Sequence, residues 1–259
     1  MSNQVLTEAA FSIRLSNGLT FFGTDKAQRL SASFLSWEIF RKKFYDRPGF
    51  RGHDGYNVVD IGANMGLFAL WMSPQIGSGR ICCVEPSSAF DALQENVRRN
   101  NLFNVDTIRT AVGSAGSTLE LLEYPEFNGV NHCADFTPPP WGQFFIRLLH
   151  FRKPLPPVRT SHFCRDLASI FDEAEFERVD LLKIDCEGGE YDIIADATDE
   201  VLSRVDRLCM EFHELHPSHD HRKLAQRLQQ CGFQVTVQRP WFERFFGKTG
   251  TIWATRCPS

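Results

Sequence analysis

The sequence of 259 residues lacks the features that mark several large classes of protein. None of its eight cysteines forms a C-x-x-C pair, which disfavours zinc ribbons and thioredoxin-type redox sites. No apolar run approaches the roughly 20 residues that cross a bilayer, and the first residues have no basic stretch followed by an apolar one. We therefore expect no membrane span and no signal peptide. Neither sign of charge dominates, because 28 basic side chains stand against 32 acidic ones, so a basic field for nucleic acid is missing.

What is present favours an ordinary globular protein. The chain is 42% hydrophobic and 23% charged, so it can bury a core, and disorder and fibrous repeats are excluded. Several cysteines lie in apolar runs such as LLKIDC and RLCMEF, where free cysteine is commonly buried. A disulfide framework is unusual in a chain of this length without a secretory signature. We therefore predict a cytoplasmic protein with reduced, buried cysteines.

Buried strands and helices alternate in the first half of the chain. Residues 56–62 and 79–86 are short apolar runs without alternation, which is typical of strands buried on both faces. Residues 65–75 and 87–101 have helical patterns, and a third strand follows at 105–113. The order strand, helix, strand, helix, strand predicts an α/β fold with a parallel, doubly wound sheet.

Further elements flank this core. Residues 11–23 predict a hairpin, and residues 31–46 a helix with aromatic side chains at spacings of three and four. We predict that residues 1–50 form an extension and residues 51–259 the ligand-binding domain. Residues 123–158 hold seven of the 13 prolines and predict an insertion packed over that domain. In the second half, the pattern predicts strands before Asp185, at 205–215 and at 234–240, and a last strand antiparallel to its neighbour.

The segment VVDIGANMG, residues 58–66, is the strongest chemical signal. Asp60 ends a buried strand, and Gly62 and Gly66 flank Asn64 in a turn where a ligand can approach the backbone closely. Glu85 ends the next strand, 25 residues after Asp60, where a carboxylate is suited to ribose hydroxyls. The middle glycine that makes room for a pyrophosphate is missing. A nucleoside with a short zwitterionic tail, such as S-adenosylmethionine, therefore fits better than a dinucleotide.

Polar side chains at the ends of two later strands are candidates for catalysis. Strand spacing puts Asp185 and Glu187 on one side of the chain, and Glu211 and His213 on one face of the following strand. A neutral His213 would serve as a general base, so we select His213, Asp185 and Glu187 as catalytic candidates. Alternatively, the carboxylates form a negative helix N-terminus and the histidine is structural. The same group could gather Mg²⁺, which is possible but not favoured, so we predict no metal site.

The sequence resembles the FkbM-type methyltransferases of the class I S-adenosylmethionine-dependent fold. The matching segments are VVDIGANMGLFAL, VEPSSAFDALQENVRRNN, AVG, LLKIDCEGGEYDII and CMEFHE. The resemblance implies a Rossmann-like sheet of seven mostly parallel strands with the last strand antiparallel. It also implies that the cofactor S-adenosylmethionine is bound by a set that includes the glycine turn, the following strand end and a loop near the adenine. We expect this set to be Asp60, Gly62, Ala63, Asn64, Gly66, Glu85, Pro86, Thr110, Ala111 and Asp185.

The resemblance implies methyl transfer, most simply to a hydroxyl of a small molecule such as a natural product or a sugar-containing metabolite. A non-catalytic S-adenosylmethionine-binding module and a nicotinamide-dependent oxidoreductase are the alternatives. Seven of the 23 phenylalanines lie in residues 1–50, five in 123–158 and three in 239–247. This distribution predicts either ordinary packing or an aromatic-lined pocket for an apolar acceptor. We expect no nucleic-acid partner, and the sequence does not indicate the oligomeric state.

Overall fold

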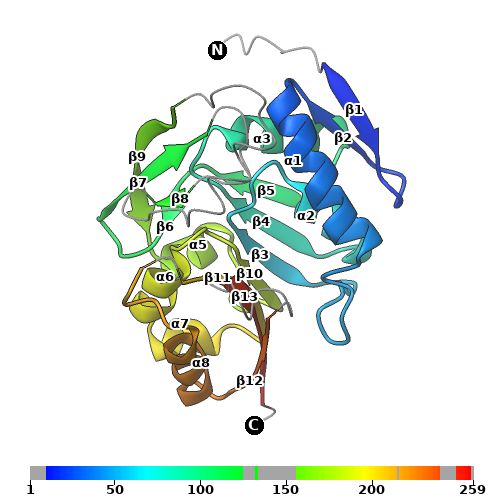
Figure 1. The fold of residues 1–259 in the computed structure, drawn as a ribbon. Helices are drawn as coiled ribbons and strands as arrows, with labels where there is room; N and C mark the ends of the chain where they lie inside the picture. The colour runs from blue at the N-terminus through cyan, green and yellow to red at the C-terminus, as the bar shows by residue number, and fades with distance from the viewer. Residues whose placement is uncertain (1–9, 125–131, 134–155, 215, 240–248, 258–259) are drawn as a thin grey trace.

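A seven-stranded sheet forms the centre of the protein in a computed structural model (Figure 1), which describes residues 10–124, 132–133, 156–214, 216–239 and 249–257. The strand order is β12-β13-β11-β10-β3-β4-β5. The bounds are β3 (Asn57–Ile61), β4 (Arg80–Val84), β5 (Val105–Ile108), β10 (Leu181–Ile184), β11 (Arg207–His213), β12 (Phe233–Gln238) and β13 (Thr249–Arg256). Only β13 runs antiparallel to its neighbours in this sheet, as the sequence predicted, and this confirms the predicted fold class.

Helices cover both faces of the sheet and give it two apolar cores. One face packs against α5 (Leu167–Glu173), α6 (Glu190–Asp196), α7 (Asp199–Ser203) and α8 (His221–Gln230). The other packs against α1 (Lys26–Ser36), the π-helix η1 (Trp37–Arg41), α2 (Leu67–Met72), the 3₁₀ turn η2 (Ser73–Gln75) and α3 (Ala89–Arg99). The adjacent Cys82 and Cys83 are both fully buried, one in each core, because successive strand residues point to opposite faces.

The predicted N-terminal hairpin is present as β1 (Phe11–Arg14) and β2 (Thr20–Gly23). Two asparagines of α3 fasten it to the domain. The fully buried Asn96 donates to Phe22 O and accepts from Phe22 N at 3.1 and 2.7 Å, and Asn100 makes the same pair of contacts with Thr20. These side chains satisfy backbone groups that β2 would otherwise leave unpaired, so the hairpin is held in register against α3.

A second sheet, which the sequence did not predict, has the order β6-β9-β7-β8. Its strands are β6 (Ala111–Val112), β7 (Thr118–Glu123), β8 (His132–Cys133) and β9 (Val158–Arg165). The segment 105–113, expected as one strand, divides into β5 in the central sheet and β6 in this one. Most of the predicted insertion at 123–158 and the aromatic loop at 239–247 lie outside the described residues.

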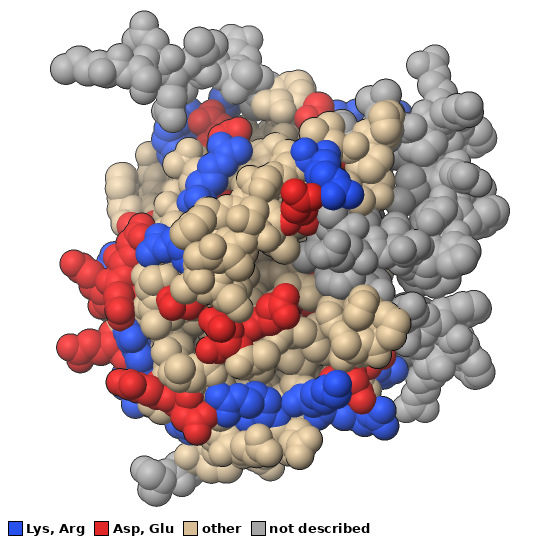
Figure 2. Space-filling view, turned by 90° about the vertical axis from the view of Figure 1, so that its left-hand side faces the viewer, with Lys and Arg blue, Asp and Glu red and all other residues tan. Residues whose placement is uncertain are grey.

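In Figure 2, acidic side chains lie around the hollow at the middle of this face, and several basic side chains form a row below them. Within the described ranges, no helix combines the length and the apolar character needed to cross a membrane. The seven cysteines whose side chains are described are free thiols, and four of them are buried as expected, whereas Cys186 and Cys231 are half-buried and Cys257 is exposed.

Candidate functional site

A cavity of about 1300 Å³ lies at the carboxyl ends of the central strands. Ligands of α/β proteins bind at this edge of the sheet. A typical pocket for one small ligand measures roughly 300–1000 Å³, so this cavity has room for two. Eight of the ten residues predicted to bind a cofactor line it: Gly62, Ala63, Asn64, Glu85, Pro86, Thr110, Ala111 and Asp185.

The glycine turn after β3 joins the ends of three strands. Gly62 has φ +76°, and a Cβ at this position would lie 1.9 Å from the backbone oxygen of Asp185. Gly62 N donates to Val84 O, and Asp185 N donates to Ile61 O, each at 3.0 Å. Only glycine permits this approach, because any side chain would push the turn away from Asp185. The turn thus fixes the floor of the cavity.

Glu85 is buried at the end of β4, with both carboxylate oxygens held by backbone amides. Asn64 N donates to Oε2 and Ser87 N donates to Oε1, each at 2.9 Å. Burial raises the pKa of Glu85, and the hydrogen bonds from Ser87 and Asn64 offset this in part. Each oxygen keeps a further lone pair for a ligand. Two accepting oxygens in a fixed orientation match the vicinal hydroxyls of a ribose.

The other two predicted residues, Asp60 and Gly66, are not among those that line the cavity. Asp60 is fully buried, and Lys183 Nζ lies 2.8 Å from its Oδ1, while Oδ2 has no partner within the described part of the chain. Gly66 has φ +88° at the start of α2, and a Cβ there would meet Leu93 Cδ1 at 2.7 Å. Both residues therefore support the cavity without lining it. Asp60 holds Lys183, and Gly66 lets α2 pack on α3.

His213 is buried at the end of β11 and surrounded by carboxylates. Its Nδ1 lies 2.9 Å from Glu190 Oε1, and its Nε2 lies 3.4 Å from Glu187 Oε2 and 3.8 Å from Glu211 Oε1. Burial lowers the pKa of His213, but the three carboxylates outweigh burial and raise it well above its usual value. The raised pKa favours the protonated form of His213 over the neutral base expected from the sequence, and His213 is not among the lining residues.

Glu187 faces the cavity beside this cation. Its backbone is left-handed, with φ +50°, and 36% of its side chain is exposed. The turn is held by the fully buried Glu190, whose oxygens accept from Cys186 N at 3.1 Å and Gly188 N at 2.9 Å. Burial, together with Asp185 and Glu190, raises the pKa of Glu187 to about 7, although His213 opposes the rise. At neutral pH this carboxyl group can therefore both accept and release a proton.

Two lining residues, Glu38 and Tyr45, were not selected from the sequence. Glu38 belongs to η1, whose wider turn is marked by the bond from Lys42 N to Trp37 O at 2.8 Å. Burial, and next Asp185, raise the pKa of Glu38. Tyr45 follows η1 and is 7% exposed. A π-helical turn often marks a functional site, but the sequence pattern of this segment indicated only an ordinary amphipathic helix.

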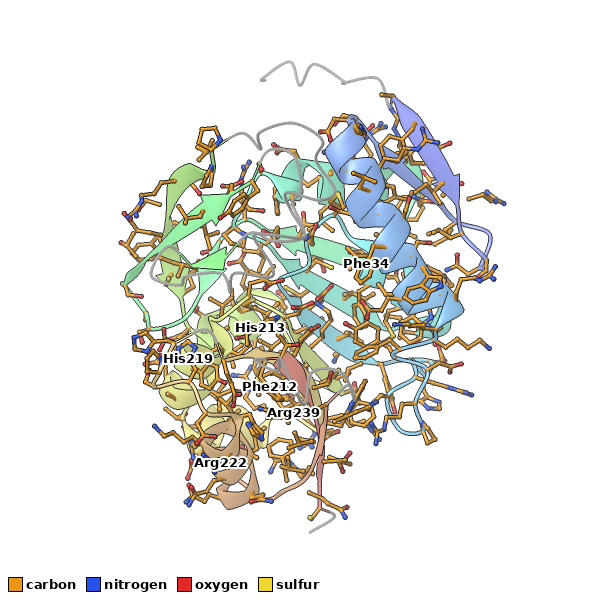
Figure 3. All side chains as sticks on the ribbon, viewed as in Figure 1. Phe34, Phe212, His213, His219, Arg222 and Arg239 are labelled. Carbon is orange, nitrogen blue, oxygen red and sulfur yellow. The ribbon has the colours of Figure 1, made fainter. Side chains whose placement is uncertain are left out.

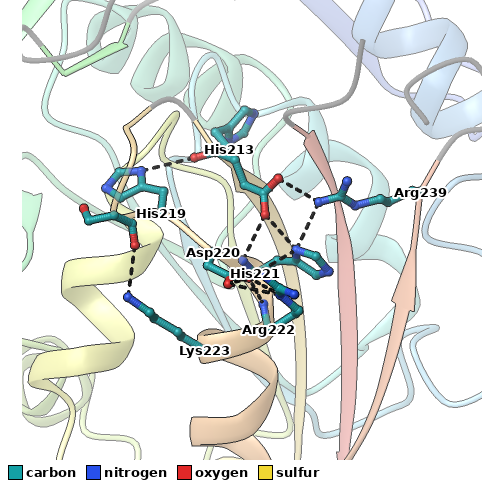
Figure 4. A network of polar contacts seen from close by, with 9 residues as sticks. His213, His219, Asp220, His221, Arg222, Lys223 and Arg239 are labelled. Carbon is teal, nitrogen blue, oxygen red and sulfur yellow. Dashed lines mark hydrogen bonds and ion pairs between the residues drawn. The ribbon is translucent and has the colours of Figure 1, made fainter. Parts of the chain in front are cut away.

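A second polar network lies beyond the end of β11, as Figures 3 and 4 show. His219 Nδ1 lies 3.3 Å from His213 O, and Glu214 contacts both His221 Nδ1 and Arg239 Nη2 at 2.7 Å. These contacts tie β11, α8 and the end of β12 together. His219, Glu214, His221 and Arg239 do not line the cavity.

Two groups of side chains have metal-ligand chemistry and lie close together, namely Asp185, Glu190 and His213, and Glu214, Asp220 and His221. In the first, Glu190 and His213 already pair with each other. In the second, Glu214 pairs with His221, and Asp220 Oδ1 accepts from Arg222 N at the start of α8. Most of these polar atoms are thus paired within the protein, whereas the Asp185 carboxylate has only Lys183 Nζ at 3.9 Å, and we assign neither group as a metal site.

Comparison with known proteins gives one family. A family model described as the methyltransferase FkbM domain matches residues 60–235. Methyltransferase 1 of Beauveria bassiana is 28% identical over 83% of this chain and 86% of its own length. Methyltransferase sdnD of Sordaria araneosa is 25% identical, over 82% and 85% of the two chains. The 31-O-demethyl-FK506 methyltransferase FkbM of Streptomyces tacrolimicus is also 25% identical, over 81% and 84%.

Proposed function

The chain belongs to the FkbM methyltransferase family, and from this premise we propose that it methylates a hydroxyl oxygen of a small molecule with apolar character. The observation that best supports this proposal is Glu187, a carboxyl group that faces the cavity with a pKa of about 7. The similarity to 31-O-demethyl-FK506 methyltransferase FkbM supports an oxygen acceptor in a natural product. The size of the cavity supports a cofactor and an acceptor bound together.

The cofactor side of the cavity is the wall made by the turn after β3 and the end of β4. S-adenosylmethionine, when bound, supplies an activated methyl group. The buried carboxylate of Glu85 would bind the ribose, and the backbone of Gly62, Ala63 and Asn64 would contact the amino-acid tail. Thr110 and Ala111, which also line the cavity, would lie against the base. The residues fit this cofactor, because Glu85 is fixed by two amides and still has lone pairs to offer.

On the acceptor side, Glu187 takes the proton of the reacting hydroxyl. Its raised pKa suits this role at neutral pH, where a general base works best when its pKa is near the working pH. The cationic His213 holds Glu187 in place at 3.4 Å, and Glu190 in turn holds His213 at 2.9 Å. Asp185, fixed by the Gly62 turn, would orient the acceptor. Positioning of this kind can supply much of the rate.

Aromatic side chains form the outer part of the same cavity and support an apolar acceptor. Phe34, Trp37, Phe44 and Trp253 all line it. Phe34 and Trp37 are 55% and 45% exposed, which is unusual for such large apolar groups unless they meet a ligand or a partner. The absence of a nucleic-acid partner and the cytoplasmic location stay predictions, as do the boundaries between the N-terminal extension and the ligand-binding domain.

The test is a transfer assay with methyl-labelled S-adenosylmethionine and a panel of hydroxyl-bearing acceptors, run with and without EDTA. We expect labelled ethers, and a loss of turnover of about 10²–10⁴-fold in Glu187→Gln with unchanged cofactor affinity. Glu177→Gln, at an exposed surface position, is the matched control and should be fully active. Cofactor binding without transfer to any acceptor would favour a binding module, and full activity of Glu187→Gln would exclude Glu187 as the base.

A further inference from the structure

The outer side of α1 and η1 carries a row of large apolar side chains that stay exposed. Leu30 is 39% exposed, and Phe34, which Figure 3 labels on α1, and Trp37 are more so. Spacings of four and three residues place these side chains on one side of the helix, and the rings of Phe34 and Trp37 lie 6.3 Å apart. An exposed apolar group of this kind marks a place where the protein meets another surface.

The surroundings of this row are basic, although the chain as a whole is slightly acidic. Residues 10–45, which include the hairpin, α1 and η1, hold six basic and two acidic side chains, whereas the whole chain has 28 and 32. All six basic side chains are exposed, and they are Arg14, Lys26, Arg29, Arg41, Lys42 and Lys43. This part of the surface therefore attracts an anionic partner, while the rest of the chain carries the excess of negative charge.

Nearby carboxylates cancel only part of this positive charge. Asp25 is the N-cap of α1 and accepts from Gln28 N at 2.8 Å. Glu38 is half-buried and lines the cavity, and Lys43 pairs loosely with Asp46 at 3.9 Å. Within the described part of the chain, Lys26, Arg29 and Arg41 form no ion pair, and α2, which packs beside α1, has no charged side chain. The exposed bases of α1 and the end of η1 are thus available to a partner.

The same row borders the opening of the cavity. Phe34, Trp37 and Lys42 line the cavity, and all three are exposed, as residues at an entrance are. Lys42 Nζ lies 4.1 Å from the centre of the Trp37 ring, so a base and an aromatic side chain stand together there. Whatever meets this surface therefore lies where the acceptor enters.

From these observations we propose that α1 and η1 dock on the surface of an anionic lipid bilayer. Leu30, Phe34 and Trp37 enter the headgroup region, and the basic side chains contact the lipid phosphates. Leucine, phenylalanine and tryptophan combined with lysine and arginine are typical of helices that lie at a bilayer surface, and aromatic rings favour the headgroup level. Docking brings the cavity opening to the bilayer, so an apolar acceptor can enter from the lipid; this last step rests on the proposed function.

The experiment is flotation of the full chain with two kinds of vesicle, phosphatidylcholine alone and phosphatidylcholine mixed with phosphatidylserine. We expect binding to the mixed vesicles that falls as salt is raised, and much weaker binding to phosphatidylcholine alone. Lys26→Glu combined with Arg29→Glu should weaken binding at least roughly 25-fold, because each base at an anionic surface contributes about fivefold. Arg222→Glu combined with Lys223→Glu is the matched control. It makes the same change of charge at the start of α8, on the other face of the sheet, and should bind nearly as the wild type does.

Trp37→Ala tests the apolar row without a change of charge and should weaken vesicle binding about tenfold. Circular dichroism checks that each variant is folded. No binding to the mixed vesicles at low salt overturns the inference and favours an acidic protein as the partner. Equal weakening in the two charge-reversal variants, or unchanged binding of Trp37→Ala, overturns it as well. Vesicle binding is measured without cofactor or acceptor, so its failure leaves the proposed function intact, and a failure of methyl transfer leaves the docking intact.

Discussion

Replacing Gly62 by alanine tests the part of the structure on which both sides of the cavity depend. The new Cβ would lie 1.9 Å from the backbone oxygen of Asp185, and the residue would have to keep φ +76°. Gly62→Ala therefore combines a strained backbone with a clash against main chain, which cannot move as easily as a side chain. The turn and the end of β10 must separate.

The magnitude follows from these two effects. A left-handed conformation costs an L-residue about 1–2 kcal/mol, and forcing extra volume into a packed region costs about 1–3 kcal/mol more. We expect Gly62→Ala to lower the free energy of unfolding by about 2–5 kcal/mol. Separation of the turn also weakens the bond from Asp185 N to Ile61 O and shifts Asp185. Cofactor affinity should therefore fall with stability.

Gly116→Ala is the matched control, because Gly116 has φ +77° and nothing within 4 Å of its added Cβ. It carries the backbone strain without the clash, so its loss should be only about 1–2 kcal/mol. Urea unfolding with a shared slope gives both values. Equal losses in the two variants would refute the reasoning, since the clash with Asp185 would then contribute nothing.

Three further predictions follow from the charged groups. Lys183→Met leaves the buried Asp60 without its cation and should lower the free energy of unfolding by about 3–5 kcal/mol; urea unfolding measures the loss, and adding Asp60→Asn should recover part of it. Because Glu187 has its pKa raised to about 7 and acts as the carboxylate, single-turnover methyl transfer should rise with pH through about 7 and then level off; a rate that falls over this range contradicts the assignment. The pKa of His213 is raised on folding, so the stability that His213 contributes is complete below its unfolded pKa of about 6.5 and is lost as pH rises through its folded pKa. The stability lost in His213→Gln, measured by urea unfolding across this range, should therefore be largest below about pH 6.5. A difference between His213→Gln and wild type that grows at higher pH contradicts this prediction.

The central fold could be predicted from the sequence because its signals are local. Apolar runs of strand length alternate with helical patterns, and each is bounded by glycine or proline. Cys82 and Cys83 illustrate the rule, since adjacent residues of a buried strand must enter opposite cores. The second sheet could not be predicted, because β7 and β9 pair across a long proline-rich segment and neither has a distinctive pattern.

Residues of the candidate site could be predicted where they depend on local backbone geometry. They could not be predicted where they depend on side chains that lie far away in the sequence. Gly62 and Glu85 follow from the strand ends and their spacing. The pairing of Asp60 with Lys183 joins residues 123 positions apart, and the protonation of His213 depends on carboxylates from two strand ends. Glu38 and Tyr45 reach the cavity only because the N-terminal helix packs there, which no spacing in the sequence reveals.

Calorimetric titration of S-adenosylmethionine into the full chain tests the central claim most directly. We expect one molecule to bind to the wild-type protein. Glu85→Ala, shown to be folded by circular dichroism, should weaken binding about 10- to 100-fold, because a charged hydrogen-bond acceptor is lost. Glu177→Gln should bind as the wild type does. Failure of the folded wild-type protein to bind S-adenosylmethionine, or binding that Glu85→Ala leaves unchanged, would contradict this account.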